Sequence, residues 1–332
     1  MTAIGSASHV KATNPLRIGL IGARSWVANQ AVIPAIEASA SCVLVAVGSS
    51  GGPVPQHLAH LDTGGYDGVL AHPDVEAVYV PLSNDQHRPW VERAAMAGKH
   101  VLCEKPLGLD GADAAAMVAV CEGAGVVLAE AWMTPFGARW AEIVGRAATG
   151  QLGEIRHLAA TFTFPLDPKQ TDNYRWNPGQ GGGALLDVGI YALGAAVALW
   201  GAEPSIVHAA ASRGVTGVDL STSAWCQWDA SRTASILVSF ELPECQRLEV
   251  VGTSGRMVAE GPAFTGGPLA TSYAFEASNG DTSPVPVVGN DPYLHMLDAF
   301  ADAVRSRRPW PRSPAETVAM ACLLDRVRQA GR

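Results

Sequence analysis

Two segments of the sequence hold the side chains best suited to moving a proton. One is an apolar strand that ends abruptly in Glu104 and Lys105, just before a proline. The other is the glycine run 181–183, which leads into an apolar helix where Asp187 and Tyr191 stand four residues apart and so share one face. A phenol with its usual pKa of ~10 is a poor proton carrier at neutral pH, but a nearby ammonium favours the phenolate. Lys105, Tyr191 and Asp187 therefore form a candidate catalytic set, and the alternatives are a solvated lysine at a strand end, a tyrosine that packs in the core and a carboxylate that satisfies the helix dipole.

The elements that must position this set alternate between strand and helix in the first part of the chain. Apolar runs predict strands at 17–21, 42–47, 77–81, 100–103 and 126–129, and the stretches between them predict helices at 27–39, 88–97 and 111–123. Such alternation predicts a parallel sheet with helices on both faces. Ligands of these sheets bind at the carboxyl ends of the strands, where Lys105 is expected.

The pattern changes after Trp132. Strands are predicted at 154–164, 206–212, 222–228, 232–241 and 247–251, with helices at 138–149 and 184–200, a loop rich in Gly, Pro and Ser from 261 to 290, and two C-terminal helices. The expected fold is an α/β Rossmann domain plus an α+β domain with a large, mostly antiparallel open-faced sheet. The expected divisions are a disordered tail (1–15), the Rossmann dinucleotide-binding domain (16–131), the α+β substrate and oligomerisation domain (132–290) and C-terminal helices that pack back on the core (291–332).

A cofactor site is predicted where the first strand turns into the first helix. This turn reads Gly22-Ala23-Arg24-Ser25-Trp26, and it departs from the GxGxxG pattern because Arg24 and Val27 stand where the second and third glycines fall. The turn nevertheless follows a strand and opens a helix, whose first amides suit a pyrophosphate, and Ser25 offers a further hydroxyl.

The end of the second predicted strand distinguishes between the two nicotinamide cofactors. An NAD site usually places a carboxylate there for the ribose 2′-hydroxyl, whereas this chain has Ser49 and Ser50 and no acidic residue before Asp62. Both serines can donate to a 2′-phosphate, and Arg24 can pair with it. The pattern favours NADP, and the alternative is a solvated turn that accepts either cofactor.

Composition excludes several other classes of function. The formal net charge of −8 would repel nucleic acid and anionic membranes. Residues 1–15 lack the apolar core of a secretion signal, and no apolar run reaches the ~18 residues of a membrane span, so a cytoplasmic protein is expected. The six cysteines form no CxxC pair, which predicts buried thiols rather than a disulfide framework or a metal site.

The chain resembles the Gfo/Idh/MocA family, named for glucose-fructose oxidoreductase and inositol dehydrogenase. The resemblance runs from Leu16 nearly to the end and rests on Glu104-Lys105-Pro106, the segment 181–191, Gly153-Glu154-Ile155 and Asp291-Pro292-Tyr293. It implies that Lys105 lies near a nicotinamide and that Tyr191 is the proton carrier. It places the chain in the tyrosine branch, with xylose dehydrogenases, dihydrodiol dehydrogenases and nucleotide-sugar 3-ketoreductases.

Further contacts follow from the resemblance and from position. The expected cofactor residues include those of the first turn, 22–26, and Glu104. They also include four residues in and after the loop that precedes the second long helix, and two aromatics: Pro81, Leu82, Asn84, His87, Trp132 and Tyr293. Trp176 is expected to stack on the sugar unless it is plain packing. Arg139, Lys169 and Arg175 are candidates for binding a nucleotide diphosphate unless they are scattered surface cations.

The resulting hypothesis is an NADP(H)-dependent oxidoreductase that reduces a nucleotide-linked ketosugar. Two alternatives stay open: a free-sugar or trans-dihydrodiol dehydrogenase, and a non-catalytic NADP-binding sensor, which would need no proton carrier. The stretch after Glu130 reads Ala131-Trp132-Met133-Thr134, where relatives usually carry a substrate-contacting His or Gln, so an unusual substrate is expected. Self-association as a homo-dimer or homo-tetramer is expected through the second-domain sheet.

Overall fold

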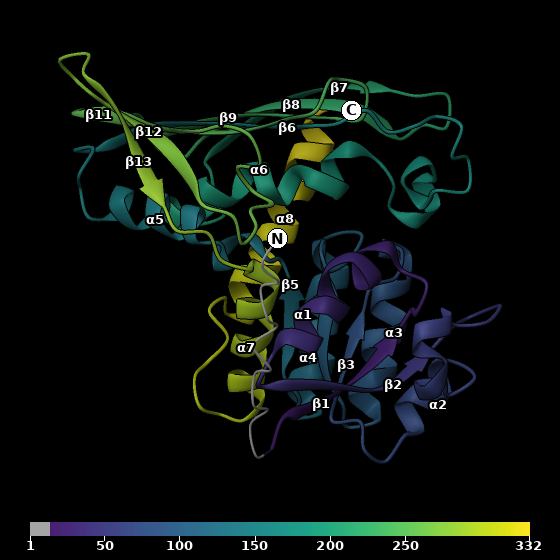
Figure 1. The fold of residues 1–332 in the computed structure, drawn as a ribbon. Coiled ribbons are helices and arrows are strands. Elements are labelled where there is room, and N and C mark those ends of the chain that lie inside the picture. Colours follow the sequence, from purple (N-terminus) through teal and green to yellow (C-terminus); the bar gives the residue numbers. More distant parts are fainter. Residues whose placement is uncertain (1–13) are drawn as a thin grey trace, which may run out of the picture.

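The structure is a computed structural model that describes residues 14–332. The predicted tail, residues 1–15, lies outside the described residues except for Asn14 and Pro15. Figure 1 shows an α/β domain below a broad sheet, with the C-terminal helices α7 and α8 running between and beside the two. The predicted fold class is confirmed, because the lower sheet is parallel and the upper one is mostly antiparallel.

The first sheet consists of five parallel strands in the order β2-β1-β3-β4-β5. Its strands are β1 (Leu16–Ile21), β2 (Cys42–Gly48), β3 (Ala77–Val80), β4 (His100–Glu104) and β5 (Leu128–Ala131). They are apolar on both faces because helices cover both sides. The chain reverses its direction across the sheet between β1 and β3, and ligands bind at the carboxyl ends of strands at such a point.

The helices of this domain differ in part from the predicted ones. The structure has η1 (Ala28–Val32, a π-helical turn), α1 (Ile33–Ala38), η2 (Gln56–Leu61), α2 (Tyr66–Ala71), α3 (Asn84–Met96) and α4 (Gly111–Gly123). The sequence predicted α4 with these bounds but missed η2 and α2, which are too short for a clear period. It also began α3 four residues late, because it placed Pro89 in the first turn of the helix, whereas the helix starts at Asn84 and contains Pro89 in its interior.

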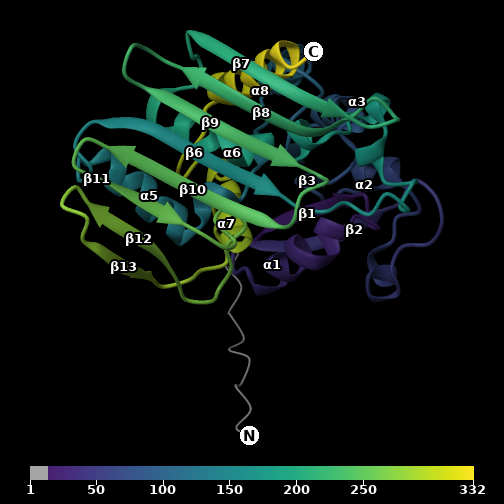
Figure 2. The same cartoon turned by 90° about the horizontal axis from the view of Figure 1, so that it is seen from above.

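The second sheet has eight strands in the order β13-β12-β11-β10-β6-β9-β8-β7. They are β6 (Ile155–Thr163), β7 (Ile206–Arg213), β8 (Asp219–Gln227), β9 (Thr233–Ser239), β10 (Cys245–Gly252), β11 (Gly255–Ala259), β12 (Thr271–Ala277) and β13 (Thr282–Val287). All neighbours are antiparallel except β6 and β9. Helices α5 (Ala138–Ala148) and α6 (Ala184–Trp200) lie under one face, and Figure 2 shows the strands of the other face uncovered.

The prediction of a loop over residues 261–290 was wrong, because most of this segment is the hairpin of β12 and β13. The two prolines of β13, Pro284 and Pro286, weakened the strand pattern. They are tolerated because β13 is an edge strand, and residues two apart direct their backbone nitrogens to the same side, away from β12.

The two C-terminal helices, α7 (Pro292–Val304) and α8 (Pro314–Ala330), connect the domains. Helix α7 contacts α1 and β2, and α8 contacts α4, α6 and β7. The side chain of Ser39 donates to Asp298 of α7 at 2.9 Å. Three short helical turns, η3 (Thr134–Phe136), η4 (Tyr174–Trp176) and η5 (Pro178–Gln180), lie in the connections around the domain boundary.

Two of the six cysteines do not fit the prediction of buried thiols. Cys245 at the start of β10 and Cys322 on α8 are exposed, whereas the other four are buried. Over residues 14–332, no group of His, Cys, Asp and Glu side chains is arranged to hold a metal ion. Within the same residues, no helix combines the length and apolar character needed to cross a bilayer.

Candidate active site

A cavity of about 780 Å³ lies between the two domains, at the carboxyl ends of β1, β3 and β4. Its floor on the first-domain side is formed by Ser25, Trp26, Val27, Pro81, Leu82, Ser83, Glu104, Lys105, Ala131 and Met133. The opposite wall contains Phe162, Phe164, Leu166, Gln170, Asn173, Tyr174, Arg175, Asp187, Val188, Tyr191, Glu244, Gln246, Thr265 and Tyr293. The predicted catalytic set therefore lines a single cavity.

Lys105 and Asp187 form an ion pair across the domain boundary. The Lys105 Nζ lies 3.2 Å from Oδ1 of Asp187 and donates to the backbone carbonyl of the same residue at 2.8 Å. Arg175 binds this carboxylate from the other side, with Nε 2.7 Å from Oδ2 and Nη2 3.0 Å from Oδ1. Burial would raise the pKa of the Asp187 carboxyl, but Arg175 and Lys105 hold it well below its usual range. Asp187 is therefore a permanent anion between two cations.

Tyr191 lies next to this cluster on α6. The Nζ of Lys105 is 5.5 Å from the centroid of its ring, and the rings of Phe162 and Phe264 pack against it. Among residues 14–332 its hydroxyl has no hydrogen-bond partner, which leaves it available to a bound molecule. Burial raises the pKa of Tyr191 to about 12, although Lys105 acts in the opposite direction.

The local sequence explains how these groups reach the cavity. Gly181 and Gly183 have φ values of +73° and +112°, which only glycine adopts without strain, and they turn the chain into α6. Asp187 lies in the first turn of that helix, and Tyr191 follows one turn later on the same face. On the other side, β4 ends at Glu104, so the next residue is delivered to the sheet edge.

Glu104 supports the backbone at Lys105. Its Oε1 accepts a 2.7 Å hydrogen bond from the hydroxyl of Tyr79, and its Oε2 accepts from the backbone N–H of Lys105 at 3.3 Å. Burial raises the pKa of the Glu104 carboxyl, and the charge of Lys105 opposes that rise. Glu104 is thus held on both oxygens, and one of them fixes the backbone at Lys105.

The turn after β1 has the form of a dinucleotide-binding turn despite its missing glycines. Gly22 has φ +120°, and a Cβ there would approach a side-chain carbon of Leu82 to 3.0 Å. The backbone N–H groups of Gly22 and Ala23 donate to the carbonyl of Gly48 at 3.2 and 3.0 Å, which ties the turn to the end of β2. A helical stretch over 26–38 follows directly, so its first amides face the cavity.

Arg24 lies beside the loop that follows β2. Its Nη1 is 3.4 Å from where a Cβ on Gly52 would stand, and the side chain is exposed. Ser49 is buried and donates to the carbonyl of Gly51 at 3.3 Å, whereas Ser50 is exposed. A cation and a hydroxyl therefore lie at this loop, which is an arrangement suited to a phosphate group.

Comparison with known proteins decides the family. A model described as the oxidoreductase family, NAD-binding Rossmann fold, matches residues 16–131, and a model of the GFO/IDH/MocA C-terminal domain matches residues 140–258. Together they cover more than half of the chain. The chain belongs to the Gfo/Idh/MocA oxidoreductase family.

Several named members of the family are similar over most of their length. The D-xylose 1-dehydrogenase (NADP(+)) 2 of Haloferax volcanii is 35% identical, over 80% of each chain. A dTDP-3,4-didehydro-2,6-dideoxy-alpha-D-glucose 3-reductase of Streptomyces violaceoruber is 32% identical over 98% of each. The crystal structure of KijD10, a 3-ketoreductase from Actinomadura kijaniata in complex with NADP and TDP-benzene, superposes with a TM-score of 0.87 at 30% identity, covering 96% of this chain and 98% of that one.

Two residues suggested by the family resemblance support the cavity from behind without lining it. The ring nitrogens of His87 lie 2.9 Å from the carbonyl of Pro106 and 3.1 Å from that of Leu82, so this buried side chain fixes two cavity loops. Asn84 is also buried, and it donates to the carbonyl of Gly181 at 2.8 Å. That hydrogen bond joins α3 to the glycine run of the other domain.

Trp132 and Trp176 were predicted to contact the cofactor or the sugar, and neither lines the cavity. Trp132 is 4% exposed and packs against Trp140 and the guanidinium of Arg312. It follows Ala131, which faces the cavity. Successive side chains of an extended segment point to opposite sides, so the side chain of Trp132 points into the core. Trp176 packs edge-on against Phe240, with ring centroids 6.0 Å apart.

Arg139 and Lys169 were candidates for binding a diphosphate, and the structure places both elsewhere. Arg139 is 6% exposed, and its Nη1 donates to Thr271 and to the carbonyls of Glu260 and Ser272. It therefore anchors the start of β12 to α5. Lys169 is exposed on a loop and does not line the cavity, whereas the next residue, Gln170, does.

The sequence did not single out Tyr174, which lines the cavity 4.9 Å from the guanidinium of Arg175. Burial raises the pKa of Tyr174. Phe162 and Phe164 belong to the strand that was predicted at 154–164, but the prediction did not indicate that one face of this strand borders the site. Gln246 was missed because nothing in the pattern of β10 marks it.

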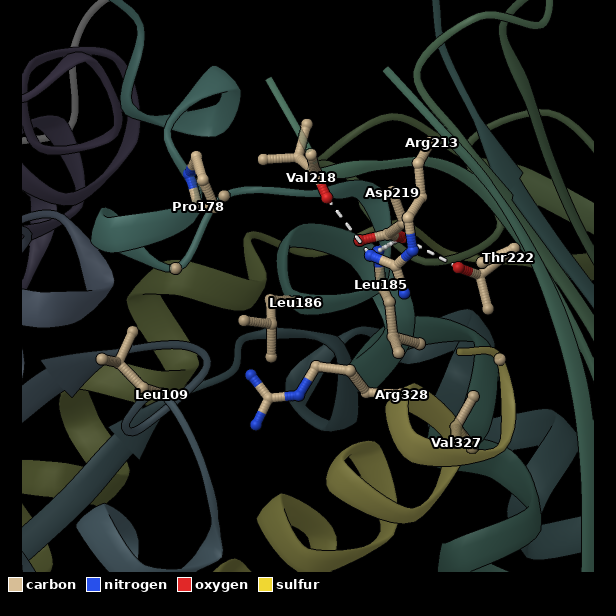
Figure 3. Close-up of a pocket in the computed structure, with 15 residues that line it drawn as sticks. Leu109, Pro178, Leu185, Leu186, Arg213, Val218, Asp219, Thr222, Val327 and Arg328 are labelled. Atoms are coloured by element: carbon tan, nitrogen blue, oxygen red, sulfur yellow. Dashed lines mark hydrogen bonds between the residues drawn. The ribbon is translucent and has the colours of Figure 1, made fainter. Parts of the chain in front are cut away.

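A second, smaller cavity of about 150 Å³ lies on the opposite side of the glycine run (Figure 3). It is lined by Leu109, Pro178, Gly181, Gly182, Leu185, Leu186, Ala211, Arg213, Gly217, Val218, Asp219, Thr222, Val327, Arg328 and Gly331. Asp219 accepts hydrogen bonds from the backbone N–H of Leu185 and the hydroxyl of Thr222, each 2.8 Å long. Lys105 and Tyr191 do not border it, so it is separate from the reactive cluster.

Proposed function

We propose that this chain is an NADP(H)-dependent oxidoreductase that transfers hydride to or from the carbonyl or hydroxyl carbon of a sugar. The observation that carries the proposal is the meeting of an ammonium from one domain, Lys105, with a phenol from the other, Tyr191, in one cavity. The cavity starts at the point of the parallel sheet where dinucleotides bind.

The first-domain residues fit such a cofactor. The turn 22–26 would hold the pyrophosphate through its backbone amides, and Arg24, Ser49 and Ser50 would hold the 2′-phosphate. Pro81, Leu82 and Tyr293 would border the nicotinamide, beside Lys105. When bound, the nicotinamide ring supplies the hydride or accepts it.

The residues of the chain provide for the accompanying proton. Tyr191 donates a proton to the substrate oxygen in reduction, and accepts one in oxidation. Lys105 stabilises the negative charge on that oxygen or on the phenolate. Asp187 anchors the ammonium, with two contacts that restrict its position.

A nucleotide-linked ketosugar is the first candidate substrate. It is supported by full-length similarity to the Streptomyces violaceoruber 3-reductase and by the TM-score of 0.87 with the TDP-benzene complex of KijD10. The cavity volume of about 780 Å³ is compatible with a large ligand.

A free sugar is a second candidate, and the charges of the cavity favour it. The two lining cations, Lys105 and Arg175, are both committed to Asp187. The other charged lining residues, Glu104 and Glu244, are acidic. A diphosphate is bound most readily by uncommitted Arg or Lys side chains, whereas an uncharged sugar needs none.

A substrate panel tests both candidates. NADPH consumption with dTDP-linked ketosugars is compared with NADP reduction by D-xylose, other free aldoses and a trans-dihydrodiol, and each reaction is repeated with NAD(H). Turnover at a defined carbonyl or hydroxyl that is lost in Tyr191→Phe supports the proposal. Tight NADPH binding without turnover of any compound would indicate the non-catalytic sensor instead.

We also propose that the chain self-associates through the uncovered face of the second sheet. This face exposes Ile206 and Trp225, at 41% and 38%, which is unusual for large apolar side chains on strands. Light scattering coupled to gel filtration should report a dimer or tetramer, and Trp225→Glu should shift it toward the monomer. A monomeric wild-type chain would contradict this part of the proposal.

A further inference from the structure

Arg175 reaches the reactive cluster from a turn that lies directly on the start of α6. The backbone N–H of Arg175 donates to Oδ1 of Asn173 at 3.1 Å, and its carbonyl accepts from the N–H of Gly183 at 3.0 Å. A Cβ on Gly182 would lie only 2.4 Å from that carbonyl oxygen. The glycine run is therefore needed so that the turn η4 can hold Arg175 over the first turn of α6.

The guanidinium binds Asp187 more completely than the ammonium does. Arg175 makes a two-pronged contact, with one nitrogen on each carboxylate oxygen at 2.7 and 3.0 Å. Lys105 makes a single side-chain contact at 3.2 Å. A bidentate arginine pair is stronger and better oriented than a single lysine contact. The carboxylate charge is thus shared by two cations, and the three groups together keep one net positive charge.

The balance would be different without Arg175. Lys105 and Asp187 would then be a neutral pair, in a place where the Asp187 side chain is 5% exposed and charges interact strongly. The carboxylate would cancel much of the field that the ammonium exerts on the Tyr191 ring, 5.5 Å from Nζ. The phenolate of Tyr191 would then be stabilised less, even though Lys105 itself is unchanged.

We propose that Arg175 is a positioning residue that takes up the charge of Asp187, so that the ammonium of Lys105 remains available to stabilise the phenolate of Tyr191. The inference rests on the proposed function, because it assumes that Tyr191 carries the proton. It differs from the earlier expectation that Arg175 binds a substrate diphosphate, since its donors are already directed at the carboxylate.

The ionisable groups around the Lys105–Tyr191 pair come from four elements: Glu104 at the end of β4, Asp187 on α6, Tyr174 and Arg175 in η4, and Tyr293 on α7. Burial raises the pKa of Tyr191, Glu104 and Asp187 raise it further, and Lys105 and Arg175 lower it. Arg175 is therefore one of two groups that favour the phenolate, and its removal should leave Lys105 as the remaining one.

Two substitutions separate the charge of Arg175 from its shape. Arg175→Gln keeps a hydrogen-bond donor for Asp187 but removes the charge, and Arg175→Lys keeps the charge but removes the fork. The phenolate of Tyr191 is followed in the full-length chain by 13Cζ-tyrosine NMR up to about pH 11, with the signal assigned by Tyr191→Phe. This measurement needs neither cofactor nor substrate. Arg213→Gln, an exposed arginine of the second cavity, is the matched control.

We expect Arg175→Gln to lower the phenolate fraction at pH 11 several-fold, by about tenfold for each unit that the pKa of Tyr191 rises. Oxidative kcat at pH 8 should fall ~10-fold or more, while Arg175→Lys recovers most of both losses. The Arg213→Gln chain should match the wild type. NADPH affinity and Tm, recorded for each variant, show whether the chain is folded.

An unchanged phenolate fraction and pH profile in Arg175→Gln, with only KM raised, would overturn the inference in favour of direct substrate binding. Equal loss in the Gln and Lys variants would overturn it in favour of a shape requirement. If Tyr191→Phe retains full turnover, the proposed function fails by itself, and the NMR comparison still tests whether Arg175 controls the phenol.

Discussion

The first turn of α6 has a cavity on each side, and each cavity is lined by one aspartate and by at least one arginine. On the reactive side Asp187 is bound by two cations and is buried. On the other side Asp219 is bound by a backbone N–H and a hydroxyl, and the nearby arginines have other partners: Arg213 donates to the carbonyl of Gly217, and Arg328 pairs with Asp325.

The difference shows what makes a carboxylate functional in this fold. Asp219 satisfies the helix start and fixes β8 against α6, which is a structural task. Asp187 sets the position and the effective charge of Lys105 beside Tyr191. Residue type does not distinguish the two, whereas the cations and the phenol around Asp187 do.

The largest expected effect that follows from this comparison is the loss of the ammonium. Lys105→Ala should reduce kcat by about 10³-fold, because both the proton carrier and the developing charge lose their stabilising cation. NADPH affinity should change by less than about threefold. Steady-state kinetics measure kcat, and fluorescence titration measures NADPH affinity. Lys169→Ala, the same substitution at an exposed lysine, is the control. Unchanged turnover would remove Lys105 from the reaction.

The pH dependence of oxidation should show the next largest effect. Burial raises the pKa of Tyr191 to about 12, so the phenol is protonated at neutral pH and oxidation must wait for its proton to leave. Oxidative kcat should therefore rise by up to tenfold per pH unit between about pH 7 and 10, whereas reduction, which needs the protonated phenol, should stay nearly flat. Rate measurements in both directions test this. A slope that persists in Tyr191→Phe would assign it to another group.

Cofactor preference should respond to a smaller extent. Arg24→Ala removes the cation next to the loop after β2, and we expect NADPH to bind about 10-fold more weakly while NADH binding changes less than twofold. Isothermal titration with both cofactors measures the change. Arg156→Ala, an exposed arginine of the second domain, provides the comparison. An equal loss for both cofactors would mean that Arg24 contacts the adenine or the pyrophosphate.

The structural aspartate should have the smallest effect on turnover. Asp219→Ala removes the acceptor for Leu185 and Thr222, and we expect Tm to fall by about 2–4 °C with kcat within about twofold of the wild type. Calorimetry and the standard assay check the two expectations. A large drop in kcat at unchanged Tm would show that the two sides of the helix start are coupled.

Helices with strong boundary signals could be predicted closely from the sequence. Helix α4 begins where Oδ1 of Asp110 accepts from the N–H of Asp113 at 2.8 Å, and α6 lies between Gly183 and Gly201. The prediction of a lysine at the sheet edge needed only the rule that parallel strands present their carboxyl ends together. Helical spacing predicted that Asp187 and Tyr191 share one face, and the family resemblance implied that this face meets Lys105.

The errors arose where the role of a residue depends on the direction in which its side chain points or on its surroundings in the folded chain. Arg139 is next to Trp140 on the buried face of α5, so its neighbours along the chain already argued against a surface site. The hairpin of β12 and β13 depends on an edge position that no local pattern displays. The binding of Arg175 to Asp187 could not be predicted, because the two residues stand twelve positions apart and only the folded chain brings them together.

The salt bridge between Lys105 and Asp187 also restricts how the enzyme can be re-engineered. A hybrid that joins this Rossmann half to the second half of a relative will keep both contacts of its lysine only if the donor provides a carboxylate at the matching depth of its own helix. A donor that lacks it would leave the ammonium with the backbone carbonyl as its one partner and with no opposing charge, so exchange partners can be screened at that position before any hybrid is built.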